Sequence, residues 1–89
     1  MSKGVPELLR LNDYGIVIGK DEQGLYIAEI EEASPASFAN IVPGMRINSI
    51  NRERAVSFKN VMDAAGKSPG RILLHIEDGN SRYFIVLTR

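Results

Sequence analysis

A turn signal near the C-terminal end constrains the fold more than any other feature. Asp78-Gly79-Asn80-Ser81 stands between two runs of mostly alternating apolar residues, Arg71 to Glu77 and Arg82 to Thr88. An Asp-Gly pair in this setting is typical of a tight β-hairpin, because glycine readily adopts the left-handed conformation that such turns need. The sequence therefore predicts that the chain closes with an antiparallel hairpin.

Further segments have the composition of strands. They are Tyr14 to Lys20, Leu25 to Ile30 and Met45 to Asn51. The first two are joined by the polar turn Asp21-Glu22-Gln23-Gly24, which predicts another hairpin. Arg52-Glu53-Arg54 predicts a polar turn into a short extension at Ala55-Val56.

Two segments predict helices. Ser34 is a suitable N-cap, and Pro35 fits the first helical position because its missing N–H would have no partner there. Asn40 is expected to end this helix, since asparagine tolerates the left-handed conformation of a C-cap. The main helix, Phe58 to Ala65, follows the N-cap Ser57 and has apolar residues at positions i, i+3, i+4 and i+7.

The order of these elements, β-β-α-β-α-β-β, predicts an α+β fold. We expect a partly open β-barrel or sandwich of five to six strands with two helices. Eighty-nine residues suffice for one domain, which we place at residues 14–89. Residues 1–13 are expected to be a linker or N-terminal extension. Within them, Pro6 to Leu11 could form one helical turn or dock three leucines on the domain.

The composition argues against several classes of function. Eleven basic and eleven acidic residues give a formal net charge of zero, so we expect neither nucleic acid nor a membrane surface as partner. The absence of cysteine excludes disulfides and thiol nucleophiles. No apolar run approaches the roughly 20 residues that span a bilayer. No secretory signal is visible, so an exported protein would carry one on a longer precursor.

No pattern predicts catalysis, a metal site or a cofactor. His75 is the only histidine, and its mid-strand position favours a structural or surface role. The serines lack a G-x-S-x-G setting, and the glycines lack phosphate-loop spacing. The acidic residues Glu29, Glu31 and Glu32 are expected at a solvated strand end. These observations argue against a stand-alone enzyme.

The stretch Ser34 to Ile47, followed by Asn48-Ser49-Ile50-Asn51, resembles a hallmark of bacterial PDZ domains, S-P-A-x-x-A-G-L-x-P-G-D-x-I-x-x-x-N-G. The matching residues are Ser34, Pro35, Ala36, Ala39, Pro43, Gly44, Ile47 and Asn51, with Ile41 in place of leucine. Four positions depart from the pattern. Asn40 and Arg52 replace glycines, Met45 replaces an aspartate, and Arg46 stands where an apolar residue is common.

The resemblance extends over about residues 12–89. Asp13-Tyr14-Gly15-Ile16 occupies the place of the G-L-G-F carboxylate-binding loop, and the final hairpin is similar to that of Do/HtrA-type serine proteases. The resemblance implies a non-catalytic module, most like the C-terminal (second) PDZ domain of a longer periplasmic protease whose catalytic domain this chain lacks. PDZ domains of a membrane-embedded metalloprotease or a type II secretion component are the alternatives.

The resemblance also implies a peptide-binding site. An extended peptide would add to an exposed edge of Tyr14 to Gly19, opposite the helix Phe58 to Ala65, with backbone N–H groups around Gly15 holding a terminal carboxylate. The implied site residues are Asp13, Tyr14, Gly15, Ile16, Val17, Ile18, Phe58, Met62 and Ala65. Whether residues 1–13 cover this groove stays open.

The implied ligands are peptides or unfolded-protein segments with hydrophobic C-termini. Phe58 takes a position where a histidine would prefer Ser or Thr two residues before the terminus, so another apolar residue is expected there. Asp13 would weaken carboxylate binding if its side chain pointed inward. Neighbouring subunits of the parent protease are the alternative partners, and the role would be substrate capture, regulation or assembly.

Overall fold

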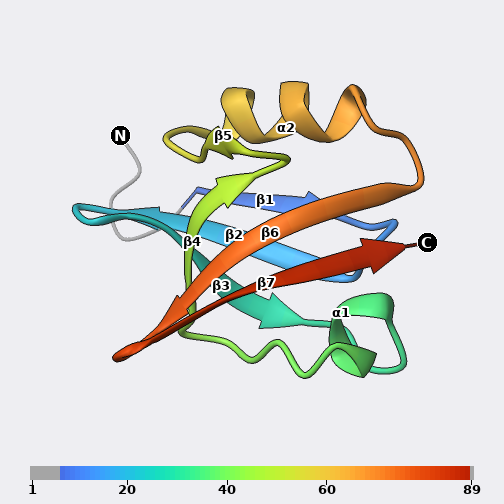
Figure 1. The fold of residues 1–89 in the computed structure, drawn as a ribbon, viewed down its shortest axis with the longest axis horizontal. Coiled ribbons are helices and arrows are strands. Elements are labelled where there is room, and N and C mark those ends of the chain that lie inside the picture. The colour runs from blue at the N-terminus through green and yellow to red at the C-terminus, as the bar shows by residue number, and fades with distance from the viewer. Residues whose placement is uncertain (1–6, 89) are drawn as a thin grey trace.

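Seven strands and two helices make up residues 7–88, the part of the chain that the computed structural model describes (Figure 1). The strands are β1 (Leu8–Leu11), β2 (Ile16–Asp21), β3 (Gly24–Ile30), β4 (Arg46–Ile50), β5 (Glu53–Arg54), β6 (Arg71–Asp78) and β7 (Ser81–Thr88), and the helices are α1 (Pro35–Phe38) and α2 (Phe58–Gly66). Neighbouring strands are antiparallel in the order β1-β2-β3-β4-β6-β7, and β5 pairs with β4. The predicted α+β class is therefore confirmed, with more strands than expected.

The predicted hairpins and helix caps are confirmed. Asp78 pairs with Ser81 across the C-terminal turn. The Ser34 hydroxyl oxygen accepts a hydrogen bond from the N–H of Ser37 at 3.2 Å, and that of Ser57 accepts one from Asn60 at 3.1 Å. Asn40 has a φ of 65°, the left-handed conformation expected where α1 ends.

Two short strands lie where the sequence did not predict them. A helical turn is wrong for Leu8–Leu11, which form β1, while residues 1–6 lie outside the described part. The polar turn expected at residues 52–54 is also wrong, because Glu53 pairs with Ile50 and begins β5. The turn is Asn51-Arg52, and both residues have positive φ, 51° and 69°. That geometry matches the twist of a two-residue hairpin.

The hydrophobic core lies between the sheet and the helices. Its largest fully buried side chains come from β2, β3, β4, α2, β6 and β7 and are Ile16, Ile18, Leu25, Ile27, Ile50, Val61, Ile72, Leu74, Ile76 and Leu87. On α2, Val61 and Ala64 are buried, as expected of its core side. Met45, the residue that departs from the PDZ pattern, is buried and accepts a hydrogen bond from the Tyr83 hydroxyl at its sulfur (3.8 Å).

Arg46, another departure from the pattern, ties β4 to the β2–β3 turn. Its guanidinium donates to both carboxylate oxygens of Asp21 at 2.8 and 2.7 Å and to the Gln23 side chain at 3.0 Å. The same group lies 5.5 Å from the centre of the Tyr26 ring. The hydrogen bonds from Arg46 lower the pKa of Asp21 from 3.8 to about 2.

This ion pair predicts a pH dependence of stability. Because the folded pKa of Asp21 lies below its unfolded value, its ionised form stabilises the fold above pH 4, and this contribution disappears as the pH falls towards about 2. We expect Asp21→Asn to lower the thermal unfolding midpoint at pH 6, with the difference from the native chain vanishing near pH 2. Glu22→Gln removes the same charge from the same turn and serves as the control. An Asp21→Asn deficit of equal size at both pH values would contradict this account.

Candidate peptide-binding edge

The strand implied as the docking strand is paired along both edges. On one side β2 pairs with β3, with an irregular register between Val17 and Ile18. On the other side it pairs with β1, from Leu8 opposite Gly19 to Leu11 opposite Ile16. Figure 1 shows β1 between β2 and α2 in its view. The expectation of an unpaired edge on this strand is therefore wrong, because residues of the predicted N-terminal extension occupy it.

In the turn between β1 and β2, two backbone N–H groups donate hydrogen bonds to the same carbonyl oxygen. The N–H groups of Tyr14 and Gly15 both donate to the carbonyl of Leu11, at 3.0 and 2.9 Å. These are two of the donors that the PDZ resemblance assigns to a ligand carboxylate. In this structure, a main-chain carbonyl at the C-terminal end of β1 receives them.

Gly15 is required for packing within the chain. It has a φ of 77°, and a Cβ there would overlap the Cβ and hydroxyl oxygen of Ser34. The Gly15 carbonyl accepts a hydrogen bond from Glu31 at 2.9 Å, and that of Tyr14 accepts one from Ala36 at 3.0 Å. The turn is thus fixed against the beginning of α1. The resemblance implied that the backbone around Gly15 holds a ligand carboxylate, whereas the close approach that the structure shows at Gly15 is to Ser34.

A cavity of about 400 Å³ adjoins this turn. It lies between the β1–β2 turn and the C-terminal end of α2, and its lining consists of Arg10, Leu11, Asn12, Asp13, Tyr14, Ala65, Gly66, Pro69 and Gly70. Three implied site residues, Asp13, Tyr14 and Ala65, therefore meet around one cavity. Arg10, whose charge could assist a terminal carboxylate, lines it as well. The contribution of Leu11, Asn12, Gly66, Pro69 and Gly70 is new, because no local sequence signal places β1 beside the end of α2.

The other implied residues lie elsewhere. Ile16, Val17 and Ile18 are buried within β2, and their backbone is paired with β1 on one side and β3 on the other. Phe58 is half-buried against the core. Met62 is 56% exposed on α2, so it is a surface residue and not core.

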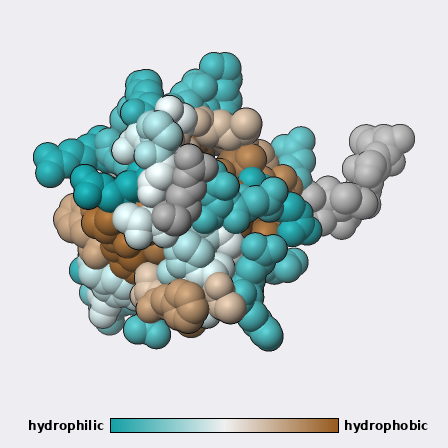
Figure 2. Space-filling model, turned by 90° about the vertical axis from the view of Figure 1, so that its right-hand side faces the viewer, coloured by the Kyte–Doolittle hydropathy of each residue, from teal (hydrophilic) through white to brown (hydrophobic). Residues whose placement is uncertain are grey.

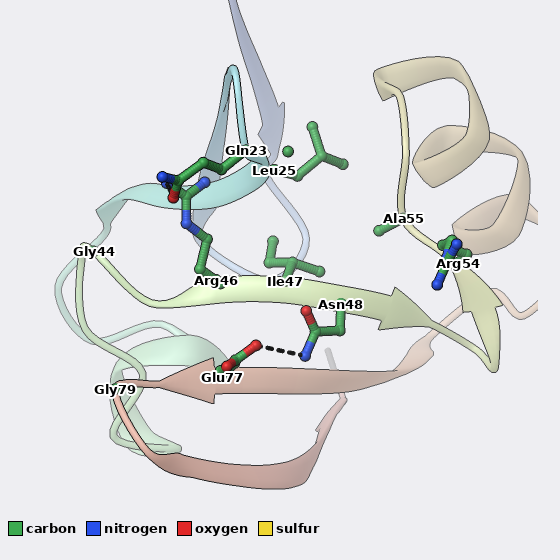
Figure 3. A pocket seen from close by; sticks show the side chains of 11 residues that line it. Gln23, Leu25, Gly44, Arg46, Ile47, Asn48, Arg54, Ala55, Glu77 and Gly79 are labelled. Atoms are coloured by element: carbon green, nitrogen blue, oxygen red, sulfur yellow. Dashed lines mark hydrogen bonds between the residues drawn. The ribbon is translucent and has the colours of Figure 1, made fainter.

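A second cavity, of about 450 Å³, lies near the β2–β3 and β6–β7 turns and contains none of the implied residues (Figure 3). Four of its polar side chains, Gln23, Arg46, Asn48 and Glu77, bond within the chain. The Asn48 amide donates to Glu77 at 3.3 Å, and Arg46 is bonded to Asp21 and Gln23. These hydrogen bonds join neighbouring strands and turns, so these residues have a structural role.

Apolar side chains are also exposed away from the candidate edge. Phe38 on α1 and Phe84 and Val86 on β7 are 76%, 64% and 55% exposed. His75 stacks on Phe84 with ring centres 4.6 Å apart, which gives this histidine a surface packing role in agreement with expectation. Figure 2 shows apolar side chains in separate patches among hydrophilic ones on the side of the molecule near the C-terminal end.

The described residues contain neither a helix long and apolar enough to cross a membrane nor a group of three acidic or histidine side chains placed to hold a metal.

Comparison with known proteins gives a partial match. No protein-family model matches the chain. Over 71 residues, 79% of its length, it is 31% identical to a protein of Chlamydia muridarum (strain MoPn / Nigg) named "Probable periplasmic serine endoprotease DegP-like". It is 32% identical over 71 residues to a protein of the same name from Chlamydia trachomatis serovar D. The chain spans 14% of the length of each relative. The chain is therefore similar to one part of these two DegP-like proteins.

Proposed function

We propose that this chain is a PDZ-type module that binds extended peptides by strand addition and serves a longer, periplasmic Do/HtrA-type serine protease. Its role there is to capture substrate segments or regulate the protease, and it performs no catalysis itself. The names of the two Chlamydia relatives support the protease and the periplasmic location. The hallmark at residues 34–51 supports the PDZ assignment.

One observation carries the proposal: a strand edge, a cluster of backbone donors and a helix end meet at one cavity. The Tyr14 and Gly15 N–H groups converge on a single oxygen there, and Ala65 of α2 lines the same cavity. Strand addition supplies affinity through main-chain hydrogen bonds and selectivity through pockets for alternate side chains. Here β1 is paired with the edge of β2 that would supply the main-chain hydrogen bonds, and the cavity at the end of α2 would supply a side-chain pocket beside it.

The test is an NMR titration of the isotope-labelled chain with peptides that end in a free apolar residue. We expect shift changes over Tyr14–Ile18 and Phe58–Met62, and we expect amidation of the peptide terminus to abolish them. Because β1 pairs with the same edge, the titration also includes Leu9→Ser, which weakens β1. No shift change at millimolar peptide in either protein would refute the proposal. Assembly with a neighbouring subunit would then be the better account.

A further inference from the structure

β1 has the geometry of a bound strand. It runs antiparallel to β2, and its C-terminal end lies at the turn that carries the two backbone donors. A ligand strand that presented its C-terminal end to the Tyr14 and Gly15 N–H groups would have the same direction. It would also use the same edge of β2. The segment Leu8–Leu11 therefore occupies the place that the proposed function gives to a peptide.

The side chains of β1 have the pattern expected of the ligand. Leu9 and Leu11 are partly buried and pack against the core, whereas Leu8 and Arg10 are exposed. Counted from its last residue, β1 has apolar side chains at the final position and two positions before it. This is the spacing that the Phe58 position favours in the implied peptides.

β1 is held weakly compared with the other neighbour of β2. It has four residues and pairs with β2 at one end of the sheet, and none of its side chains is among those fully buried in the core. The strand on the other side, β3, has seven residues and buries Leu25 and Ile27. Short edge elements with few buried contacts open locally at low free-energy cost. Release of β1 would therefore leave the core in place.

We infer that β1 is a built-in, displaceable occupant of the peptide-binding edge, and that the ligands are extended segments with apolar residues at alternate positions, as in Leu9-Arg10-Leu11. The inference rests on the proposed function. The apparent affinity of any peptide is reduced in proportion to the fraction of molecules in which β1 is released. A peptide must therefore compete with β1 for the edge of β2, and peptides with the same alternation of apolar residues compete best.

A reversible disulfide lock tests this inference. Arg10 and Val17 are cross-strand partners, and such pairs in antiparallel sheets lie within disulfide reach. The chain has no native cysteine, so Arg10→Cys/Val17→Cys creates one possible bond. The probe is the free-acid peptide Pro-Glu-Leu-Leu-Arg-Leu, which copies residues 6–11. We expect it to bind the reduced variant and to lose at least about tenfold in affinity after oxidation. The native chain under the same oxidant is the control.

A second pair of variants tests the same point without a crosslink. Leu9→Ser removes an inward-facing leucine of β1, and we expect it to raise peptide affinity about tenfold. Leu8→Ser removes an outward-facing leucine of the same strand and should leave the affinity unchanged. Thermal unfolding of both variants checks that the sheet is intact.

The outcomes separate this inference from the proposed function. If the oxidised double variant binds the probe as tightly as the reduced one, β1 is not the barrier and the inference is overturned, while peptide binding at another edge stands. If neither the reduced variant nor Leu9→Ser binds the probe at millimolar concentration, the proposed function fails and the inference fails with it.

Discussion

Replacement of Gly15 by alanine is expected to lower the free energy of unfolding by about 3 kcal/mol. The φ of 77° disfavours any side chain, and the added Cβ would overlap Ser34 at the start of α1. Movement of the turn to relieve that overlap would disturb the Tyr14–Ala36 and Gly15–Glu31 hydrogen bonds. The thermal unfolding midpoint should fall by about 15 °C.

Gly79→Ala is the matched control. Gly79 also has a positive φ, 63°, but a Cβ there would meet nothing within 4 Å. Gly79→Ala should therefore lower the free energy of unfolding only by the strain of a side chain at positive φ, about 1 kcal/mol. The difference between the two variants, measured by urea unfolding followed by circular dichroism, reports the contact with Ser34. Equal losses in the two variants would show that the close approach to Ser34 does not constrain the turn.

Asn51→Gly is expected to cost about 2 kcal/mol, because it removes two side-chain hydrogen bonds to partly buried backbone. The Asn51 amide donates to the Ala64 carbonyl at 2.8 Å, and its oxygen accepts from the Leu73 N–H at 2.9 Å. One side chain thus links the β4–β5 turn to α2 and to β6. Glycine retains the φ of 51° without strain, so the variant isolates the loss of hydrogen bonds.

The neighbouring variant Arg52→Gly provides the comparison. Arg52 has a φ of 69° in the same turn and is exposed. Glycine at this position relieves the left-handed strain, so we expect its unfolding midpoint to equal or exceed that of the native chain. Asn51→Gly should fall about 10 °C below it. Midpoints within about 3 °C of each other would contradict a linking role for Asn51.

The candidate site was only partly predictable. The resemblance placed Asp13, Tyr14 and Ala65 in one site, and the structure brings these three to one cavity. It also implied an open edge on β2, which β1 occupies. Leu8-Leu9-Arg10-Leu11 lacks β-branched residues and turn signals of its own, so its sequence did not favour a strand. Its conformation comes from main-chain pairing with β2, which local pattern cannot report.

The sequence by itself determined the local elements: the Asp78-Gly79 hairpin, the caps at Ser34 and Ser57, and the left-handed Asn40. Each depends on residues only a few positions apart, whose hydrogen bonds and backbone preferences act wherever the segment lies. The tertiary structure alone decided that β1 covers β2 and that Gly15 abuts Ser34. These contacts join segments whose approach is set by how the whole sheet packs around its core, so no single segment encodes them.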